Sequence, residues 1–281
     1  MRRSCLWFMG AIELMRKECL RRRYSLETVK AYSYCVGKFL RRNSKEVKKT
    51  TKVDVQRYLD YLVERGASAS TLNVNLSALK FLFEEILGKK LTVKVKFAKV
   101  PKRLPDFLTK EEIKKLFEAI GNPKHKLMIE LLYSTGMRVS ELVNLKVEDL
   151  CLNEGYGWVR QGKGNKDRPM VVAERIRTRL SERIIGKKLE SGDFVFQSYC
   201  GKYSTSTIRK ILERAAKESG ISKRVHPHML RHSFATHLVE EGNGVDVIQP
   251  LLGHNRIETT MVYLHASPKR FLSVKSPYDS L

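Results

Sequence analysis

Apolar residues recur every three or four positions through most of this chain, and this spacing restricts it to a mainly helical fold. The first clear stripe follows Ser25, a suitable helix N-cap, and the last one in the N-terminal third ends at Gly88. Three such stripes lie between them: Val29, Tyr32, Val36, Phe39 and Leu40; Val55, Tyr58, Leu59 and Leu62; Leu72, Leu76, Leu79, Phe83 and Leu87. With residues 12–23 they predict a small bundle of about four helices over residues 11–90.

The first ten residues, MRRSCLWFMG, are expected to form a poorly specified leader. Their apolar part is too short for the core of a signal peptide, and Glu13 and Arg16 follow it closely. No apolar run in the chain reaches the roughly 18 residues that a membrane helix needs. A membrane anchor is therefore not expected.

Residues 92–106, TVKVKFAKVPKRLPD, break the helical pattern. Lysines alternate with apolar residues there, and Pro101 and Pro105 bracket a basic pair. This composition is typical of a linker and marks a domain boundary. We therefore expect a helical domain, a basic linker and a second domain, over residues 1–95, 96–107 and 108–281.

The second domain opens with a capping box, in which Glu112 follows Thr109 by three residues. Further helices are expected at about residues 124–134, 138–146, 174–187, 205–219 and 227–240. The stretch YGWVRQGKGNKDRPMVV predicts two short strands, because apolar runs flank a turn rich in Gly, Asn and Asp. The C-terminal domain is therefore expected to be mostly helical with a small antiparallel sheet.

Positive charge is spread over both domains. The 54 Lys and Arg residues exceed the 30 Asp and Glu residues, which gives a formal net charge of +24. Residues 1–100 hold 23 basic and 9 acidic side chains, and residues 101–281 hold 31 and 21. A polyanion is the natural partner for such a balance. If the charge served only solubility or binding to a membrane surface, a basic tail would be the more usual arrangement. Charge spread over both domains therefore favours nucleic acid as the partner.

The cysteines indicate a reducing compartment. They are odd in number, far apart and never spaced as CxxC, so neither a disulfide framework nor a zinc site is indicated. The five are Cys5, Cys19, Cys35, Cys151 and Cys200. A cytosolic location is expected on this ground.

The stretch STGMRVSEL holds the first candidate for chemistry. A glycine turn leads into a helix whose start carries Arg138, and Glu141 lies three residues further on. The free N–H groups of a helix start attract phosphate, and a guanidinium there adds bidentate hydrogen bonds. Glu141 shares a face with Arg138 and is expected to orient it. An arginine at a helix start is also a common surface charge.

The stretch HPHMLRHSFATHL holds the second candidate. His228 and Arg231 are three residues apart and share one face of the expected helix, while the apolar residues form the buried stripe. An imidazole beside a guanidinium suits an anion bound between them. We expect His232 and His237 to be packing or capping residues and His226 to lie in a loop.

A metal site is not expected in this histidine-rich stretch. His228 and His232 have the spacing of two ligands on one helix face, but no HExxH glutamate accompanies them. No carboxylate lies nearby in the sequence either.

Two further candidates lie in the strand turn and near the C-terminus. Lys163 has glycines on both sides, so its loop can approach another backbone closely, although a lysine at a loop tip is most often only solvated. In LLGHNRIETTMVYLH, nine residues separate His254 from Tyr263, and a new short helix is expected to start near Met261. A turn between two short helices would bring both side chains to one cleft. A tyrosine among such apolar neighbours is otherwise a core residue.

Together these candidates are hydrogen-bond donors without a carboxylate pair: two arginines, two histidines, a lysine and a tyrosine. Such a set suits a phosphodiester, whose transition state spreads negative charge over the non-bridging oxygens. A phenol with a pKa near 10 is a weak nucleophile unless a base or a positive field assists it. The two guanidiniums and an imidazole would supply that field.

The ordered segments TGMRVSEL, GKGNKDR, HMLRHSFATHL, LLGHN and TTMVY closely resemble those of the tyrosine recombinase (lambda-integrase-like) family, and most of all its Xer-type chromosome-dimer resolvases. The resemblance covers roughly residues 107–266. It implies a SAM-like, core-binding N-terminal domain and a mixed α/β catalytic domain that is mostly helical. It also implies strand exchange without ATP, cofactor or metal, by a homotetramer on two paired sites of double-stranded DNA.

The resemblance also implies a role for each candidate. Tyr263 would be the nucleophile that forms a 3′-phosphotyrosyl link and releases a 5′-hydroxyl. Arg138 and Arg231 would clamp the scissile phosphate, and His228 would act as acid or base near the tyrosine.

Lys163 would protonate the leaving 5′-oxygen, and His254 would donate a hydrogen bond to the phosphate. Pro250 departs from the family pattern, because a proline there removes a helical hydrogen bond and either kinks the segment before His254 or ends the helix early. The segment after Tyr263 is short, and in this family such a segment docks on a neighbouring subunit.

Three alternatives remain open at this point. A phage, plasmid or mobile-element integrase would use the same chemistry. A type IB topoisomerase would relax supercoils as a monomer without needing paired sites. A DNA-binding module with a decayed catalytic set would bind without cutting.

Overall fold

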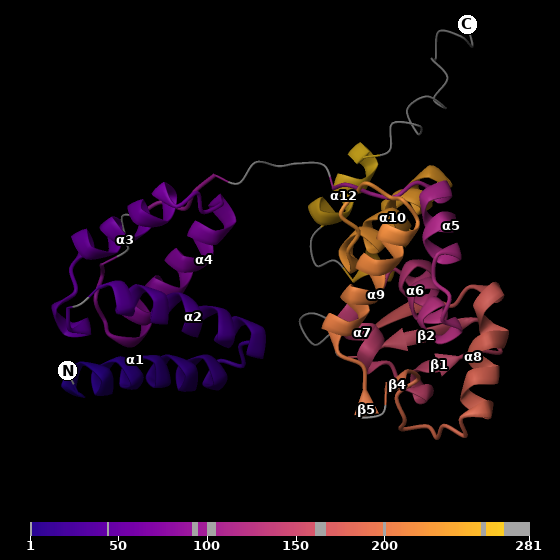
Figure 1. Cartoon of the computed structure of the whole chain (residues 1–281), viewed down its shortest axis with the longest axis horizontal. Coiled ribbons are helices and arrows are strands. Elements are labelled where there is room, and N and C mark those ends of the chain that lie inside the picture. The colour runs from indigo at the N-terminus through magenta and orange to yellow at the C-terminus, as the bar shows by residue number, and fades with distance from the viewer. Residues whose placement is uncertain are drawn as a thin grey trace, which may run out of the picture. The chain divides into compact units, whose positions relative to one another are not determined.

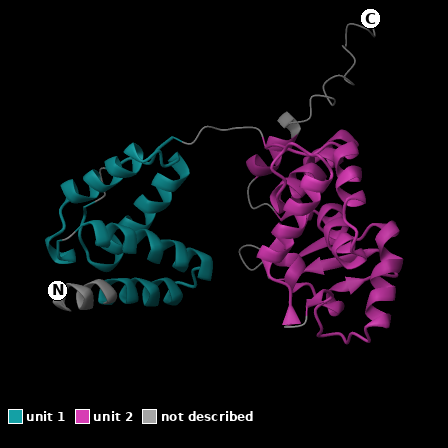
Figure 2. Ribbon diagram, in the orientation of Figure 1, with its two compact units in different colours: residues 1–102 teal, residues 103–281 magenta. Residues whose placement is uncertain are grey.

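The computed structural model describes residues 2–43, 45–91, 95–99, 105–160, 167–198, 201–253 and 257–266. The chain forms two compact units, Met1–Lys102 and Arg103–Leu281, which are coloured separately in Figure 2. The regular elements described in the first unit are all helices, and the second unit combines helices with small antiparallel sheets (Figure 1). The expected mainly helical fold is confirmed.

The N-terminal unit contains four α-helices, a 3₁₀ turn and a π-helical segment within the described residues. They are α1 (Arg2–Arg21), α2 (Leu26–Arg42), η1 (Val47–Lys49), α3 (Lys52–Glu64), α4 (Ala69–Lys80) and η2 (Phe81–Ile86). Ser25 caps α2 as predicted, since its side chain accepts a hydrogen bond from the backbone N–H of Thr28. The prediction of a poorly specified leader is wrong, because α1 begins at Arg2.

Aromatic rings form the centre of this unit. Phe39 of α2 is fully buried and packs edge-on against Tyr58 of α3 and Phe83 of η2, with ring centroids 5.2 and 5.8 Å away. Such edge-to-face pairs contribute about 0.5–1.5 kcal/mol beyond the area that they bury. The π-helical turn continues α4 and buries three successive residues, Phe81 to Phe83, which an ideal α-helix would spread around its surface.

The C-terminal unit is built around a three-stranded antiparallel sheet in the order β1-β2-β3. Its described elements are α5 (Lys110–Glu118), α6 (Pro123–Thr135), α7 (Val139–Asn144), η3 (Val147–Asp149), β1 (Leu150–Cys151), β2 (Tyr156–Val159), β3 (Arg168–Val171), α8 (Glu174–Gly186), β4 (Gln197–Ser198), β5 (Gly201–Lys202), α9 (Thr205–Glu218), α10 (Pro227–Glu240), α11 (Val245–Leu252) and α12 (Ile257–Ala266). The strands β2 and β3 pair with Tyr156 opposite Val171 and Val159 opposite Arg168. The predicted pair of strands is confirmed, and the turn that joins them lies outside the described residues.

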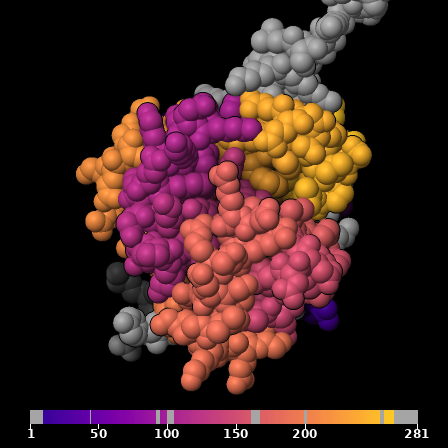
Figure 3. All heavy atoms as spheres, turned by 90° about the vertical axis from the view of Figure 1, so that its right-hand side faces the viewer, coloured from indigo at the N-terminus to yellow at the C-terminus, as the bar shows by residue number. Residues whose placement is uncertain are grey.

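Fully buried aliphatic and aromatic side chains hold this unit together. The largest of them are Leu108, Leu116, Met128, Ile129, Leu131, Leu132 and Phe196. Each such burial contributes about 1.5–3 kcal/mol relative to an exposed side chain. α8 lies on the outside, and Figure 3, which views the molecule from that side, shows its atoms over the lower part of the face. α10 packs against both α6 and α12, so it connects the core to the C-terminal helices.

The residues next to the expected linker are held by hydrogen bonds within each unit. Asn73 of α4 bonds both backbone groups of Ala98, at 2.9 Å to its carbonyl and 2.8 Å from its N–H. In the second unit Lys223 donates to the carbonyl of Phe107 at 3.0 Å, and Ser233 of α10 accepts from the N–H of Leu108 at 2.9 Å. Among the described residues, no helix combines the length and apolarity that crossing a bilayer requires.

The capping box predicted from the sequence is present at the start of α5. The hydroxyl of Thr109 accepts from the N–H of Glu112 at 3.2 Å, and the carboxylate of Glu112 accepts from the N–H of Thr109 at 2.8 Å. We expect Thr109→Ala to lower the free energy of unfolding by about 1 kcal/mol, because one helix N–H loses its acceptor. Urea denaturation of the full chain measures this change.

Thr178→Ala is the matched control, since Thr178 is exposed in the interior of α8. The control should leave stability unchanged or raise it slightly, because alanine is the better helix former. Equal losses in the two variants would show that the cap contributes nothing.

Candidate active site

A sharp turn between α6 and α7 presents the first predicted arginine. Gly136 ends α6 in the left-handed region, with φ of 59°, and a Cβ atom there would lie 2.3 Å from Phe234. Only glycine fits this turn without displacing its neighbour. Arg138 follows as the N-cap of α7, and its guanidinium donates to the carboxylate of Glu141 at 2.7 Å. The expected orientation of Arg138 by Glu141 is confirmed.

The same carboxylate binds a second guanidinium, that of Arg168 at the start of β3. Arg168 donates to Glu141 at 2.7 Å, and each side chain is only 6% exposed. Burial alone would raise the pKa of Glu141, but Arg168 and the N–H and guanidinium of Arg138 lower it below its usual value. Glu141 is therefore a carboxylate at neutral pH.

Arg231 of α10 is the most buried of the three arginines, with 3% of its surface exposed. It donates to the carbonyl of Gly136 at 2.8 Å and to the carbonyl of Leu252. Burial, together with the positive charges of Arg138 and Arg168, lowers the pKa of Arg231 to about 10, so the guanidinium is charged at neutral pH.

These three arginines and Glu141 form what we call the arginine cluster. It carries three positive charges and one negative charge, which leaves a net charge of about +2 in poorly solvated surroundings. A buried excess of one sign is costly unless an ion of opposite charge compensates it. The cluster is therefore suited to an anion with at least one full negative charge.

The cluster also holds the end of α11. Arg168 donates to the carbonyl of Leu251 and Arg231 to that of Leu252, so two of the terminal carbonyls that a helix leaves unbonded find partners. Gly253 follows with φ of 61°, and a Cβ there would lie 2.6 Å from the Arg168 side chain. Pro250 does not end the helix, which continues for two residues beyond it.

Tyr263 of α12 faces this region from the C-terminal side. The tyrosine is 3% exposed, and its hydroxyl oxygen lies 3.0 Å from Nδ1 of His232 on α10. Burial raises the pKa of Tyr263, while the positive charges of Arg231 and Arg138 act to lower it. The phenol is therefore protonated at rest and lies within the field of both arginines. α12 begins at Ile257, four residues earlier than the predicted start near Met261.

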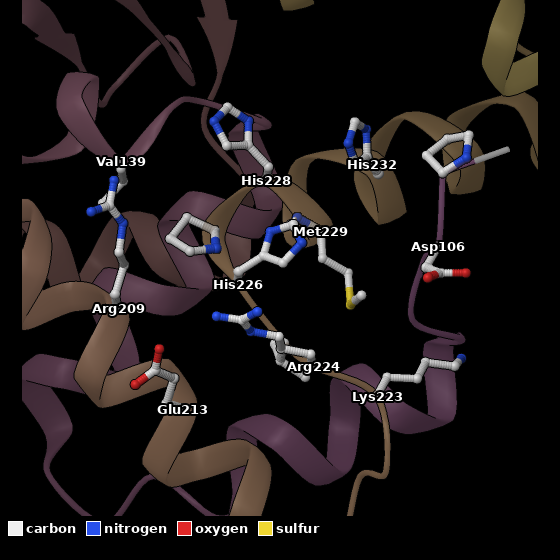
Figure 4. Close-up of a pocket in the computed structure, with 13 residues that line it drawn as sticks. Asp106, Val139, Arg209, Glu213, Lys223, Arg224, His226, His228, Met229 and His232 are labelled. Atoms are coloured by element: carbon white, nitrogen blue, oxygen red, sulfur yellow. Dashed lines mark hydrogen bonds between the residues drawn. The ribbon is translucent and has the colours of Figure 1, made fainter. Parts of the chain in front are cut away.

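A pocket of about 720 Å³ opens beside α10. His226, His228 and His232 line it along the start of the helix, with Arg209 and Arg224 nearby (Figure 4). Burial and then Arg231 lower the pKa of His228, whose residue surface is nonetheless exposed, so the neutral imidazole is available at the pocket wall. The pocket is therefore lined mostly by polar and basic side chains, and it reaches His232, the residue that contacts Tyr263.

Three of the six residues predicted to carry the chemistry lie near enough to influence one another's charge: Arg138, Arg231 and Tyr263. His228 lies in the adjoining pocket on the same helix as Arg231. Lys163 and His254 lie outside the described residues. Among the described side chains, no three His, Cys, Asp or Glu residues converge as metal ligands would.

Two residues of the site were missed by sequence reasoning. His232 packs against the ring of Tyr263 as predicted, with centroids 5.6 Å apart, but its Nδ1 also lies 3.0 Å from the tyrosine hydroxyl, a contact that the sequence did not indicate. Arg168 is the last residue of the segment GKGNKDR, and the alternation along β3 places it on the buried face with Met170. An arginine on the apolar face of a strand is unusual, and this pattern could have indicated that Arg168 has a buried partner. His237 does pack as predicted, with Nδ1 2.8 Å from the hydroxyl of Tyr133.

Comparison with known proteins identifies the family of this chain. The phage integrase family matches residues 106–270, and the N-terminal SAM-like domain of phage integrases matches residues 12–93. The chain therefore belongs to the phage integrase family, the lambda-integrase-like tyrosine recombinases. Enzymes of this class carry out site-specific recombination.

The relatives place the chain with the Xer type of this family. Tyrosine recombinase XerA of Pyrococcus furiosus is 37% identical over 251 residues, which cover 87% of this chain and 85% of the relative. A tyrosine recombinase of Pseudothermotoga lettingae is 36% identical over 255 residues, covering 87% and 89%. Among solved structures, the chain is similar to the crystal structure of XerH site-specific recombinase bound to difH substrate, a pre-cleavage complex. The TM-score is 0.70 and the sequence identity is 27%, and the match covers 90% of this chain and 81% of that one.

The buried ion pair gives a prediction for stability. We expect Glu141→Gln to lower the free energy of unfolding by about 3–5 kcal/mol at neutral pH, because Arg138 and Arg168 lose their carboxylate. Since the pKa of Glu141 is lowered in the folded chain, its contribution is complete above the ordinary glutamate pKa and disappears as the pH falls through the lowered value. Denaturation at neutral and acid pH should therefore show the difference from wild type shrinking in acid.

Glu148→Gln is the control, because Glu148 is 48% exposed and pairs with Lys146 at 3.1 Å on the surface. Its loss should stay below about 1 kcal/mol. If Glu141→Gln cost no more than this control, the cluster would not depend on its carboxylate.

Proposed function

We propose that this recombinase cuts and rejoins duplex DNA through a covalent 3′-phosphotyrosyl intermediate on Tyr263. The observation that carries the proposal is a buried phenol beside a cluster of guanidiniums with uncompensated positive charge. A phosphodiester supplies the missing negative charge, and its charge grows on the non-bridging oxygens as the phosphorus is attacked. The same charges lower the cost of developing a phenolate.

The proposed reaction conserves a phosphoester bond. The oxygen of Tyr263 bonds to phosphorus, the bond from phosphorus to the 5′-oxygen breaks, and the 5′-oxygen leaves as a hydroxyl. Attack by another 5′-hydroxyl reverses the step and releases the tyrosine. Because the bond energy is retained, the cycle needs neither ATP nor a metal ion.

Each catalytic residue has a proposed part in this step. Arg138 and Arg231 hold the non-bridging oxygens, since guanidiniums form paired hydrogen bonds with phosphate. Lys163 protonates the leaving 5′-oxygen, and His254 donates a hydrogen bond to the phosphate. His228, which lines the pocket beside α10, is the acid or base that the resemblance places near the tyrosine.

We propose that both units bind the same DNA and that the chain resolves chromosome dimers in the cytosol. The positive charge of both parts of the sequence supports the first point. The similarity to recombinases named XerA and XerH, one of them described on a difH substrate, supports the second. An integrase of a mobile element would differ in its sites rather than in its chemistry.

The proposed working form is a homotetramer on two paired sites. Exchange between two duplexes cuts four strands, and each chain supplies one Tyr263. Four subunits are therefore needed for one complete exchange. A topoisomerase, in contrast, cuts and rejoins a single strand with one subunit.

The tyrosine assignment has a direct test on a nicked duplex that carries a site selected by the protein from random-sequence DNA. Cleavage near the nick releases a short fragment and traps the covalent complex. We expect Tyr263→Phe to bind this duplex with unchanged affinity and to form no covalent complex, because only the attacking oxygen is removed. Denaturing gels measure the complex, and gel shifts measure binding.

Tyr133→Phe is the matched control, since Tyr133 is half-buried and, like Tyr263, hydrogen-bonded to a histidine of α10. Burial and the nearby Glu241 and Glu240 raise the pKa of Tyr133 to about 12, whereas arginines act to lower that of Tyr263. This control should form the complex as the wild type does. Covalent complexes in the Tyr263→Phe protein would overturn the proposed function.

A further inference from the structure

The hydrogen bond between His232 and Tyr263 joins the nucleophile to a residue that the family resemblance did not assign. Nδ1 of His232 lies 3.0 Å from the hydroxyl oxygen, with the two rings tilted and their centroids 5.6 Å apart. The tyrosine is 3% exposed, so bulk water has little access to its hydroxyl. A proton that leaves this oxygen needs an acceptor within the protein.

We propose that His232 is the proton acceptor for Tyr263 during attack on the phosphate, an inference that rests on the proposed function. The phenolic proton moves to Nδ1 of His232 as the oxygen's electron pair forms the bond to phosphorus. The bond from phosphorus to the 5′-oxygen breaks at the same time, and that oxygen takes its proton from Lys163. On rejoining, the proton on His232 returns to the departing tyrosine oxygen.

The surroundings of His232 keep its imidazole neutral and therefore able to accept. Burial comes first among the causes, and the neighbouring His228, His226 and Arg231 act in the same direction, so the pKa of His232 falls to about 4. Burial raises the pKa of Tyr263, so the proton stays on the phenol at rest. Transfer becomes favourable only when the oxygen bonds to phosphorus, because an aryl phosphate oxygen is barely basic.

The arriving phosphate also compensates the charge that the transfer creates. Protonated His232 would stand beside Arg231 and near two other imidazoles, which is unfavourable in the free protein. Bound phosphate adds negative charge at the same place, and the transition state adds more. Because proton transfer from Tyr263 to His232 becomes favourable only when phosphate is bound, the tyrosine loses its proton only in the DNA-bound state.

The geometry favours His232 over His228 for this task. Both belong to α10, one helical turn apart, and both line the pocket. Of these two histidines, His232 lies within hydrogen-bonding distance of the tyrosine, whereas the residue surface of His228 is exposed. His228 is thus left free to contact the phosphate.

The test compares His232→Asn with His237→Asn on the nicked duplex described above. An asparagine can place an amide atom near the position of Nδ1 and keep the hydrogen bond, but it cannot take up the proton. His237 is the matched control, because its Nδ1 also contacts a tyrosine, Tyr133, from the same helix. We expect His232→Asn to form the covalent complex about 10²-fold or more slowly, and the control to match the wild type.

A sulfur substitution separates proton removal from leaving-group protonation. A duplex with sulfur in place of the bridging 5′-oxygen needs no acid for its leaving group. This duplex should restore cleavage by Lys163→Ala and should leave the defect of His232→Asn unchanged. A restored His232→Asn rate would show that the imidazole acts on the leaving group instead, and the proposal would fail.

Replacing Tyr263 with a ring-fluorinated tyrosine distinguishes loss of the proton acceptor from loss of structure, because only the former should be partly relieved by a more acidic phenol. The fluorinated phenol is more acidic, so it should recover part of the rate in the His232→Asn protein. His232→Gln serves as a second variant if the Asn protein binds DNA or unfolds differently from the wild type. A rate within about threefold of wild type in either variant, or no gain from fluorination, would overturn the role of His232. The proposed function would survive that result, since it fails only if Tyr263→Phe still forms the complex.

Discussion

The buried carboxylate of Glu141, shared by two guanidiniums, is the contact on which the site depends. Arg138 reaches it from the start of α7 and Arg168 from the start of β3, both at 2.7 Å. Arg168 extends the connection to the carbonyl of Leu251 at the end of α11. A single ion-paired network therefore fixes three segments, the first and last of which lie more than a hundred residues apart in the sequence.

The end of α11 is a favourable place for buried positive charge. The terminal carbonyls of a helix carry a partial negative charge, and Arg168 and Arg231 each donate to one of them. These carbonyls offset part of the cost of burying two guanidiniums. They do not cancel it, because partial charges leave the net excess of the arginine cluster in place. The remaining charge is what a phosphodiester would neutralise, so the same contacts that order the helix prepare the site for DNA.

The position of Tyr263 links this charge to the proposed chemistry. Its hydroxyl is held by His232 on one side and lies in the field of Arg231 and Arg138. A phenolate formed without DNA would be reactive and costly, and burial disfavours it. Phosphate binding supplies both the target of the attack and the charge that makes proton transfer possible.

Local chemistry explains which features were predictable. The caps at Ser25 and Thr109, the helical stripes and the strand pair around the glycine-rich turn depend on neighbours within a few residues, so the sequence pattern reports them directly. The start of α1 was missed because its basic first turn has no acidic or capping signal.

The contacts of Arg168 and His232 depend on segments far away in the sequence. Arg168 bonds α11 across 83 positions, and His232 bonds Tyr263 across 31. Spacing along one helix could identify His228 and Arg231 as a pair, but it could not show which histidine meets the tyrosine. Only the packing of α12 against α10 decides that.

Mapping the covalent attachment site tests the central claim most directly. The complex trapped on the nicked duplex is digested with trypsin and nuclease, and the nucleotide-bearing peptide is identified by mass spectrometry. We predict the modification on Tyr263 within IETTMVYLHASPK, residues 257–269. Attachment to another peptide, such as LMIELLYSTGMR with Tyr133, would contradict the claim that the arginine cluster activates the phenol of Tyr263.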